Sequence, residues 1–182
     1  MDDLDLVGWR ESVEASMASL LVGFQDRMGY PPSDNHLGEP APADDVEALA
    51  VALDGRLPDS LGRFYASVGE VHLPDFWNAL FITAPSRMLA DIRADEVPRR
   101  ITGAYDMDVL AFGDDGGGAR FLLGIPEGGP VFKAPLAATV GGLYETNTEG
   151  FRRLADDLTG FLRLVERELH QWATQGSPPS FF

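Results

Sequence analysis

The stretch VLAFGDDGGGARFLL at residues 109–123 decides the fold of this chain. Two apolar runs, 109–112 and 120–123, flank a segment of aspartates and glycines. Short apolar runs around such residues are typical of two antiparallel strands joined in a β-hairpin. A further strand is expected at 131–132, after the glycine and proline break that follows the hairpin. The sequence therefore predicts an antiparallel sheet built around residues 109–123.

Helical periodicity marks both ends of the chain. Apolar residues recur every three or four positions along 6–28 and again along 151–172, which predicts a long amphipathic helix in each segment. Thr148 is the expected N-cap of the second of these helices. Shorter elements are expected between them, as helices at 44–53, 58–68 and 86–93 and as a strand at 79–83. The whole pattern predicts an α+β fold in which a small, mainly antiparallel sheet packs against several helices.

A single domain suits the 182 residues of the chain. Glycines and prolines between 29 and 43 predict an extended connector after the first helix. We expect residues 1–43, which hold this helix and the connector, to belong to the same domain as residues 44–175. The apolar face of the first helix could instead pack on a second copy of the chain. The C-terminal tail at 176–182 is expected to be loose.

The chain is strongly acidic, with 29 aspartates and glutamates against 14 arginines and lysines and a formal net charge of −15. Such a field repels nucleic-acid phosphates and anionic lipid head groups, so we expect neither nucleic acid nor a membrane as a partner. The charge could serve solubility alone, or it could steer the chain towards a basic protein such as a nuclease. The acidic start of the chain and the lack of a long apolar run predict a cytoplasmic location.

The sequence contains no recognisable pattern of catalytic residues. Since cysteine is absent, thiol nucleophiles, disulfides, iron–sulfur clusters and cysteine-bound zinc are excluded. The three histidines lie far apart in the sequence, so a histidine-based zinc site is not expected. A nucleophile elbow, a Walker loop and a dinucleotide fingerprint are all missing. We therefore expect a protein that is not an enzyme, needs no cofactor or metal, and works by binding another protein.

Six residues near predicted loops are candidates for contact with a protein partner. Glycines after an acidic residue leave little side chain to block an approaching protein, and aromatic residues beside such loops often supply binding energy. The candidates are Asp114, Asp115 and Gly116 in the hairpin turn, Asp108 before it, and the aromatic residues Tyr105 and Trp77. Turn formation is the simpler explanation of the aspartates, and core packing could explain the aromatic residues. A calcium loop is not expected, because the closing glutamate of that motif is missing.

Replacement of both turn aspartates by asparagine separates these interpretations. Asparagine also suits turns, so we expect folding to remain intact. If Asp114 and Asp115 contact a basic partner, the double replacement should weaken binding by about 1–3 kcal/mol. If they only form the turn, stability and binding should barely change.

Three blocks of the sequence resemble the SUKH superfamily of Smi/Knr-like proteins. The first block resembles a helix near the start of that domain and consists of Leu57, Pro58, Phe64, Tyr65 and Gly69. Residues 109–123 are similar to the superfamily's central hairpin, and residues 151–165 to its closing amphipathic helix. The blocks follow the expected order and together span about residues 44–170. Val68 departs from the pattern, since a polar residue often precedes the helix-ending glycine there.

The resemblance implies both a fold and a kind of function. It implies an α+β domain without catalytic residues. Many bacterial members are immunity proteins that bind and neutralise toxins of polymorphic toxin systems, and others are eukaryotic regulators of cell-wall assembly. We therefore predict an immunity protein that neutralises a toxin by binding it. The alternative is a regulatory or scaffold protein that binds a non-toxin partner, and an enzyme of unrecognised type is a third hypothesis.

Overall fold

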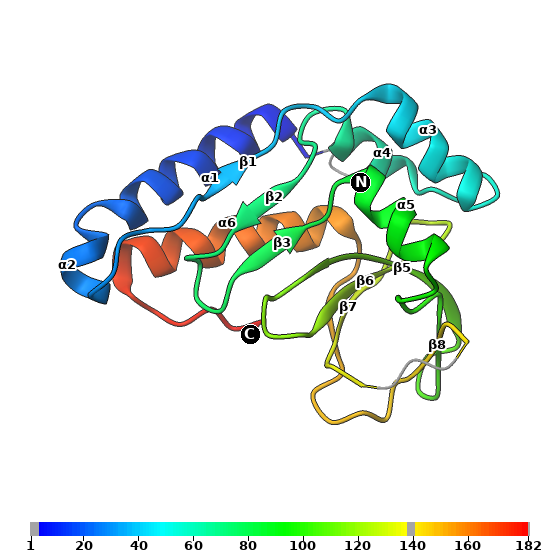
Figure 1. The fold of residues 1–182 in the computed structure, drawn as a ribbon. Coiled ribbons are helices and arrows are strands. Elements are labelled where there is room, and N and C mark those ends of the chain that lie inside the picture. Colours follow the sequence, from blue (N-terminus) through cyan, green and yellow to red (C-terminus); the bar gives the residue numbers. More distant parts are fainter. Residues whose placement is uncertain (1–3, 138–140, 182) are drawn as a thin grey trace.

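The computed structural model describes residues 4–137 and 141–181. Within this part of the chain there are six helices and nine strands, and the predicted α+β fold is confirmed (Figure 1). The helices are α1 (Leu6–Leu21), α2 (Phe24–Met28), α3 (Ala43–Ala52), α4 (Asp59–Tyr65), α5 (Pro85–Arg93) and α6 (Leu158–Gln175). The strands are β1 (His36–Leu37), β2 (Val71–Leu73), β3 (Leu80–Ile82), β4 (Arg100–Thr102), β5 (Met107–Asp114), β6 (Arg120–Gly124), β7 (Val131–Ala134), β8 (Leu143–Glu145) and β9 (Arg152–Ala155). None of the described helices is long and apolar enough to cross a membrane.

The predicted hairpin at 109–123 lies at the centre of the sheet. β5 and β6 pair antiparallel, and the pairing ends with Asp114 opposite Arg120. The register shifts between Ala111 and Gly113, which is the mark of a β-bulge. Gly113 is required at this place because a Cβ atom would lie 2.2 Å from a backbone carbonyl oxygen of β3.

The strands form one open sheet in the order β1-β2-β3-β5-β6-β7-β9, and every pair along this path is antiparallel. β3 pairs with the end of β5 and β4 with its beginning, so two strands share one edge of β5. β8 pairs with β4 in the parallel direction. The sheet is therefore mainly antiparallel, as predicted, with β4–β8 as the exception.

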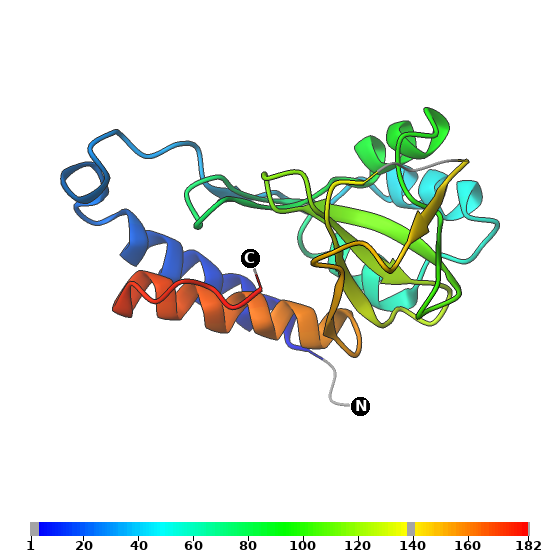
Figure 2. The ribbon, with the colours of Figure 1, turned by 90° about the horizontal axis from the view of Figure 1, so that it is seen from below.

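α1 and α6 lie side by side against one face of the sheet (Figures 1 and 2). The indole Nε1 of Trp9 in α1 donates a hydrogen bond to the carbonyl oxygen of Leu162 in α6 at 2.9 Å. The same ring packs edge-on against Phe64 of α4, with 5.9 Å between ring centroids. The N-terminal helix thus packs on its own chain, and its buried face is not left for a second copy.

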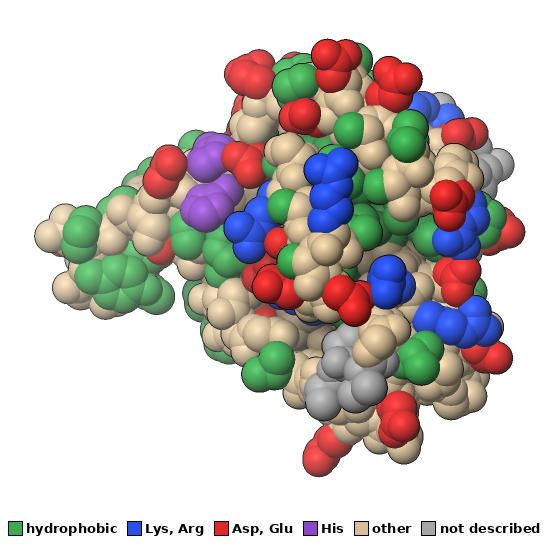
Figure 3. Space-filling view, turned by 45° about the vertical axis from the view of Figure 1, so that its right-hand side comes forward, with side chains coloured by type: hydrophobic (Ala, Val, Ile, Leu, Met, Phe, Trp, Pro, Cys, Tyr) green, Lys and Arg blue, Asp and Glu red, His purple; other side chains and the backbone are tan. Residues whose placement is uncertain are grey.

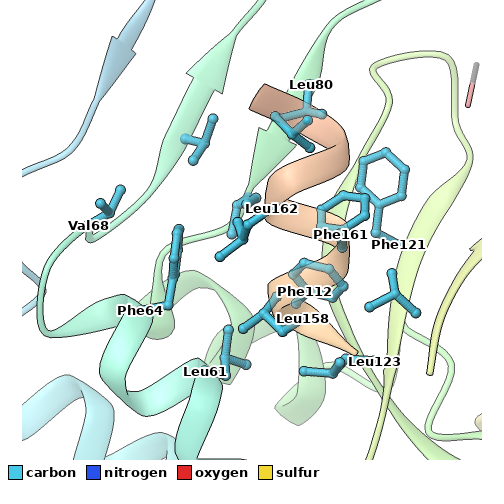
Figure 4. Close-up of a cluster of buried hydrophobic side chains, with 14 of the residues drawn as sticks. Leu61, Phe64, Val68, Leu80, Phe112, Phe121, Leu123, Leu158, Phe161 and Leu162 are labelled. Atoms are coloured by element: carbon cyan, nitrogen blue, oxygen red, sulfur yellow. The ribbon is translucent and has the colours of Figure 1, made fainter. Parts of the chain in front are cut away.

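The main hydrophobic core lies between this helix layer and the sheet (Figure 4). Phe112 and Phe121 of the hairpin meet Phe161 of α6, with ring centroids 5.4 and 5.2 Å apart, and all three side chains are fully buried. Burial of a phenylalanine side chain contributes about 1.5–3 kcal/mol. The hairpin and the last helix therefore hold each other in place.

A second, smaller core lies on the opposite face of β5, β6 and β7. It consists of Val97, Ile101, Val109, Ala111, Leu122, Phe132, Ala134 and Tyr144. Ile101 and Tyr144 come from β4 and β8, so these two strands cover that half of the sheet. In the part of the chain that the structure describes, no helix or strand covers β1 and β2 on the face opposite α1 and α6 (Figure 2). One end of the sheet is thus covered by helices on one face only.

Two helices in the first 70 residues end earlier than predicted. The helix expected at 6–28 is interrupted after Leu21, where Gly23 adopts a left-handed φ of +61° and separates α1 from α2. The helix expected to end at Gly69 ends at Tyr65. Gly69 serves another purpose, because a Cβ atom there would lie 2.3 Å from the carbonyl oxygen of Glu39. Glycine at this position allows a close backbone approach.

The last helix begins later than its apolar spacing predicts. Residues 152–155 form β9, which pairs with β7, and α6 begins only at Leu158. Asp157, and not Thr148, is the N-cap, and its side chain accepts the N–H of Gly160 at 2.7 Å. Strand pairing at the sheet edge overrides the helical periodicity of this segment.

The C-terminal tail is anchored where a loose segment was expected. Phe181 is 2% exposed and packs edge-on against Phe76, with 6.1 Å between ring centroids. The buried carboxylate of Glu168 accepts hydrogen bonds from the backbone N–H and the hydroxyl of Ser180, at 2.8 and 2.9 Å. The tail was predicted as loose because apolar burial of a single terminal residue leaves no periodic signal in the sequence.

Candidate functional site

Asp115 is the structural centre of the hairpin turn. It is only 4% exposed. One carboxylate oxygen accepts the N–H groups of Gly117 and Ala119, at 2.9 and 3.0 Å, and the other lies 2.8 Å from Nζ of Lys133. The structure therefore assigns Asp115 to the fold, in contrast to the expectation that it meets a partner. It also contradicts the expectation that asparagine can replace it freely, because a buried lysine would lose its carboxylate.

The rest of the hairpin turn packs against the turn that connects β2 and β3. A Cβ atom on Gly116 would lie 2.7 Å from both the Cβ of Ala79 and the carbonyl oxygen of Asn78. Gly116 also has a φ of +66°, which favours glycine. Asp114 accepts the N–H of Gly116 at 3.0 Å and is partly exposed. The structure thus brings Asp114 and Gly116 next to the turn that carries Trp77.

Trp77 is presented on a strained turn. Its φ is +56° and that of Ala79 is +111°, and such values cost about 1–3 kcal/mol for a residue with a Cβ atom. Trp77 is 42% exposed and stands edge-on to Trp172 of α6, with 5.1 Å between ring centroids. Leu136, 82% exposed, borders the hairpin turn beside Gly118. An exposed aromatic residue on a strained turn is a typical anchor for a protein partner.

Tyr105 and Asp108 lie near the other end of β5. Oδ2 of Asp108 is 2.6 Å from Nη1 of Arg56, and Oδ1 is 2.8 Å from Nη1 of Arg100. The hydrogen bond from Arg56 and, to a smaller extent, the one from Arg100 hold the pKa of the Asp108 carboxyl below its usual range. Tyr105 packs edge-on against Phe132, with 4.7 Å between ring centroids. Both candidates have partners within the fold, and the structure separates them from the hairpin turn.

A row of side chains crosses five strands on the sheet face opposite α1 and α6. The pairing register places directly opposite one another His36 of β1, His72 of β2, Phe81 of β3, Asp114 of β5 and Arg120 of β6. Residues paired directly across antiparallel strands point to the same face. The residues on either side of this row in β2 and β3 belong to the main core, so the row faces away from it. We call these five partly exposed residues the open face.

Aromatic rings fill one end of the open face. The imidazoles of His36 and His72 stack with 5.2 Å between centroids, and His72 lies 4.8 Å from the ring of Phe81. A Cβ atom on Gly116 would lie 3.4 Å from the ring of Phe81. The open face therefore continues directly into the hairpin turn and, beside it, the turn that carries Trp77.

Carboxylates flank the aromatic end. Oδ2 of Asp34 and Oε1 of Glu70 lie 3.3 and 3.4 Å from the two ring nitrogens of His36. Figure 3 shows histidine side chains with acidic side chains on both sides. Next to them is a shallow hollow of about 240 Å³, whose lining includes Glu70, His72, Phe81, Thr83 and Arg87. At this end of the open face, aromatic rings and carboxylates lie close enough together to contact the same side chain of a partner.

His36, His72 and Phe81 were not among the site residues predicted from the sequence. A signal for them exists in the triplets VHL at 71–73 and LFI at 80–82, where the outer residues are buried and the middle one points outward. Two strands of three residues are too short for alternation to be recognised without knowledge of the pairing. The row appears only when the register across β1, β2 and β3 is known.

The described residues, 4–137 and 141–181, include no cluster of three or more histidine, aspartate or glutamate side chains placed to hold a metal ion. No model of a known protein family matches the chain, and no curated protein matches it in sequence.

Proposed function

We propose that this chain is a non-catalytic protein-binding domain that neutralises a toxin by covering the toxin's functional surface. The observation that carries the proposal is the open face itself, an uncovered part of the sheet that ends beside the strained β2–β3 turn. The exposed Trp77 of that turn lies at the edge of this face, on the side of Trp172 in α6. A rigid sheet costs little conformational entropy on binding, and its half-exposed rings provide contact area.

The charge of the chain supports a basic partner. The net charge of −15 raises the rate of encounter with a positive protein, such as a nuclease with a phosphate-binding groove. The resemblance of three sequence blocks to the SUKH superfamily points the same way, since many bacterial members of that superfamily are immunity proteins. Neutralisation would follow from steric cover of the partner's substrate site.

Co-expression with the product of the neighbouring gene tests the proposal. We expect the two proteins to co-purify and the chain to rescue the growth of cells that produce the neighbour. Affinity should fall steeply between 50 and 500 mM salt, because steering by charge is screened over about 10 Å at 0.1 M salt. A complex without any growth phenotype would favour the regulatory or scaffold alternative. Failure both to form a complex and to rescue growth would contradict the proposal.

A further inference from the structure

We infer that the aromatic and acidic end of the open face is a recognition site for an arginine side chain of the partner. This inference rests on the proposed function and specifies which group of a basic protein the chain reads. It concerns the hollow beside Glu70, His72 and Phe81.

Ring faces are the first element of this site. His72 and Phe81 lie next to each other with 4.8 Å between centroids and 39° between ring planes, and both are partly exposed. Because the two strands pair in register, their backbone holds the rings in place. A planar guanidinium stacks on such rings, whereas a lysine ammonium is a compact and strongly hydrated point charge. The rings therefore favour arginine over lysine.

Negative charge is the second element. The side chain of Glu70 borders the hollow and is 44% exposed. Its Oε1 lies 3.4 Å from Nε2 of His36, and the carboxylate of Asp34 lies on the other side of His36. A guanidinium over the rings would place its N–H groups within reach of Glu70, and arginine–carboxylate pairs are among the stronger charged contacts in proteins. Ring stacking and ion pairing would then act on the same group.

The chain's own arginine at this place is already paired. Arg87 of α5 also borders the hollow, but its Nε lies 2.9 Å from Oδ1 of Asp91, one helical turn along α5. Its charge is directed along the helix towards Asp91. The hollow thus keeps an acidic side at Glu70 for a cation that comes from outside.

A titration followed by ¹⁵N nuclear magnetic resonance tests the site on the whole chain, with a hexa-arginine peptide as the probe and hexalysine and hexaglutamate peptides for comparison. We expect the largest shifts from hexa-arginine at residues 34–37, 70–73 and 80–83. Hexalysine should bind about fivefold more weakly, and hexaglutamate should not bind.

Matched variants separate a built site from general attraction to an acidic protein. Glu70→Gln and Phe81→Leu should each raise the dissociation constant of hexa-arginine about fivefold. Glu11→Gln removes the same charge from an exposed position of α1, on the helix-covered side of the sheet. This variant should change the dissociation constant of hexa-arginine less than twofold. Glu70 is at the surface, so its variant remains informative if Phe81→Leu folds poorly.

Shifts spread evenly over the acidic surface, equal effects of Glu70→Gln and Glu11→Gln, or equal affinity for hexa-arginine and hexalysine would each overturn the arginine site. These outcomes are distinct from failure of the proposed function. If the chain binds the neighbouring gene product and Glu70→Gln binds it as tightly as the original chain, the site is wrong while the function stands. If no partner is captured but the peptide titration behaves as expected, the site stands and the toxin-neutralising function does not.

Discussion

Nζ of Lys133 in β7 lies 2.8 Å from Oδ2 of Asp115, and both side chains are largely buried beneath the hairpin turn. Lys133 is the one lysine of the sequence. The same carboxylate organises the turn through two backbone N–H groups. This ion pair explains why two adjacent aspartates, 114 and 115, have different environments: Asp115 is buried in the fold, and Asp114 belongs to the open face.

The two aspartates should respond differently to replacement by asparagine. We expect Asp115→Asn to lower the free energy of unfolding by about 1–3 kcal/mol, since it leaves a buried lysine without its carboxylate. Asp114→Asn, its matched control, should change this free energy by less than about 0.5 kcal/mol. Urea unfolding of the two single variants measures both values. Equal effects would show that the Lys133 pair does not matter to the fold.

Trp77→Asn should separate binding from stability. Asparagine tolerates positive φ better than tryptophan, so relief of strain should offset much of the lost contact with Trp172, and the free energy of unfolding should change by about 1 kcal/mol or less. Partner affinity should fall about tenfold or more, as for other buried aromatic anchors. Tyr30→Asn, which removes an exposed aromatic residue at the end of α2, is the control and should leave affinity unchanged. A Trp77 variant with full affinity would remove this turn from the interface.

Asp108→Asn should leave partner binding unchanged, because its carboxylate serves Arg56 and Arg100. Its effect is on stability and depends on pH. The folded pKa of Asp108 is lowered, so the carboxylate contributes stability above the pKa of an unfolded aspartate, and this contribution is lost as pH falls through the folded value. The stability difference between the original chain and the variant should be about 1 kcal/mol or less near pH 7 and should shrink as the pH falls below about 4 towards the lowered folded pKa of Asp108. Weaker partner binding by the variant would return Asp108 to the list of contact residues.

Glu168→Gln should release the C-terminal tail. Burial alone would raise the pKa of Glu168, but hydrogen bonds from Ser180 and Arg167 outweigh burial and hold the pKa below its usual range. The carboxylate therefore stabilises the fold above the pKa of an unfolded glutamate, and acid removes this contribution. We expect the variant to lose about 1–3 kcal/mol of unfolding free energy near neutral pH and to be cut faster by protease near residues 176–181. Unchanged protease resistance would mean that Phe181 alone anchors the tail.

Features with a strong local signal could be predicted from the sequence. Apolar runs around a glycine and aspartate turn gave the hairpin at 109–123, and a sustained helical period gave most of α1 and α6. The segment at 152–155 was misread because its spacing also fits a helix, and only its pairing with β7 makes it a strand. Strand pairing is a tertiary effect that periodicity within one segment cannot reveal.

The candidate site was predictable in part for the same reason. Trp77, Asp114 and Gly116 were predicted as contact residues because turns concentrate binding residues, and the structure places their two turns next to each other. Asp115 was wrongly predicted to contact a partner, because an ion pair with a lysine 18 positions later leaves no local pattern in the sequence. His36, His72 and Phe81 come from three strands of two or three residues, so only their register shows that they form one row.

Hydrogen–deuterium exchange of the chain, alone and in complex with the neighbouring gene product, tests the central claim most directly. If the open face and the Trp77 turn form the interface, binding should slow exchange at residues 34–37, 70–83 and 114–120 and leave residues 104–108 unchanged. Slower exchange confined to 104–108 or to α3, with none across β1, β2 and β3, would contradict the account.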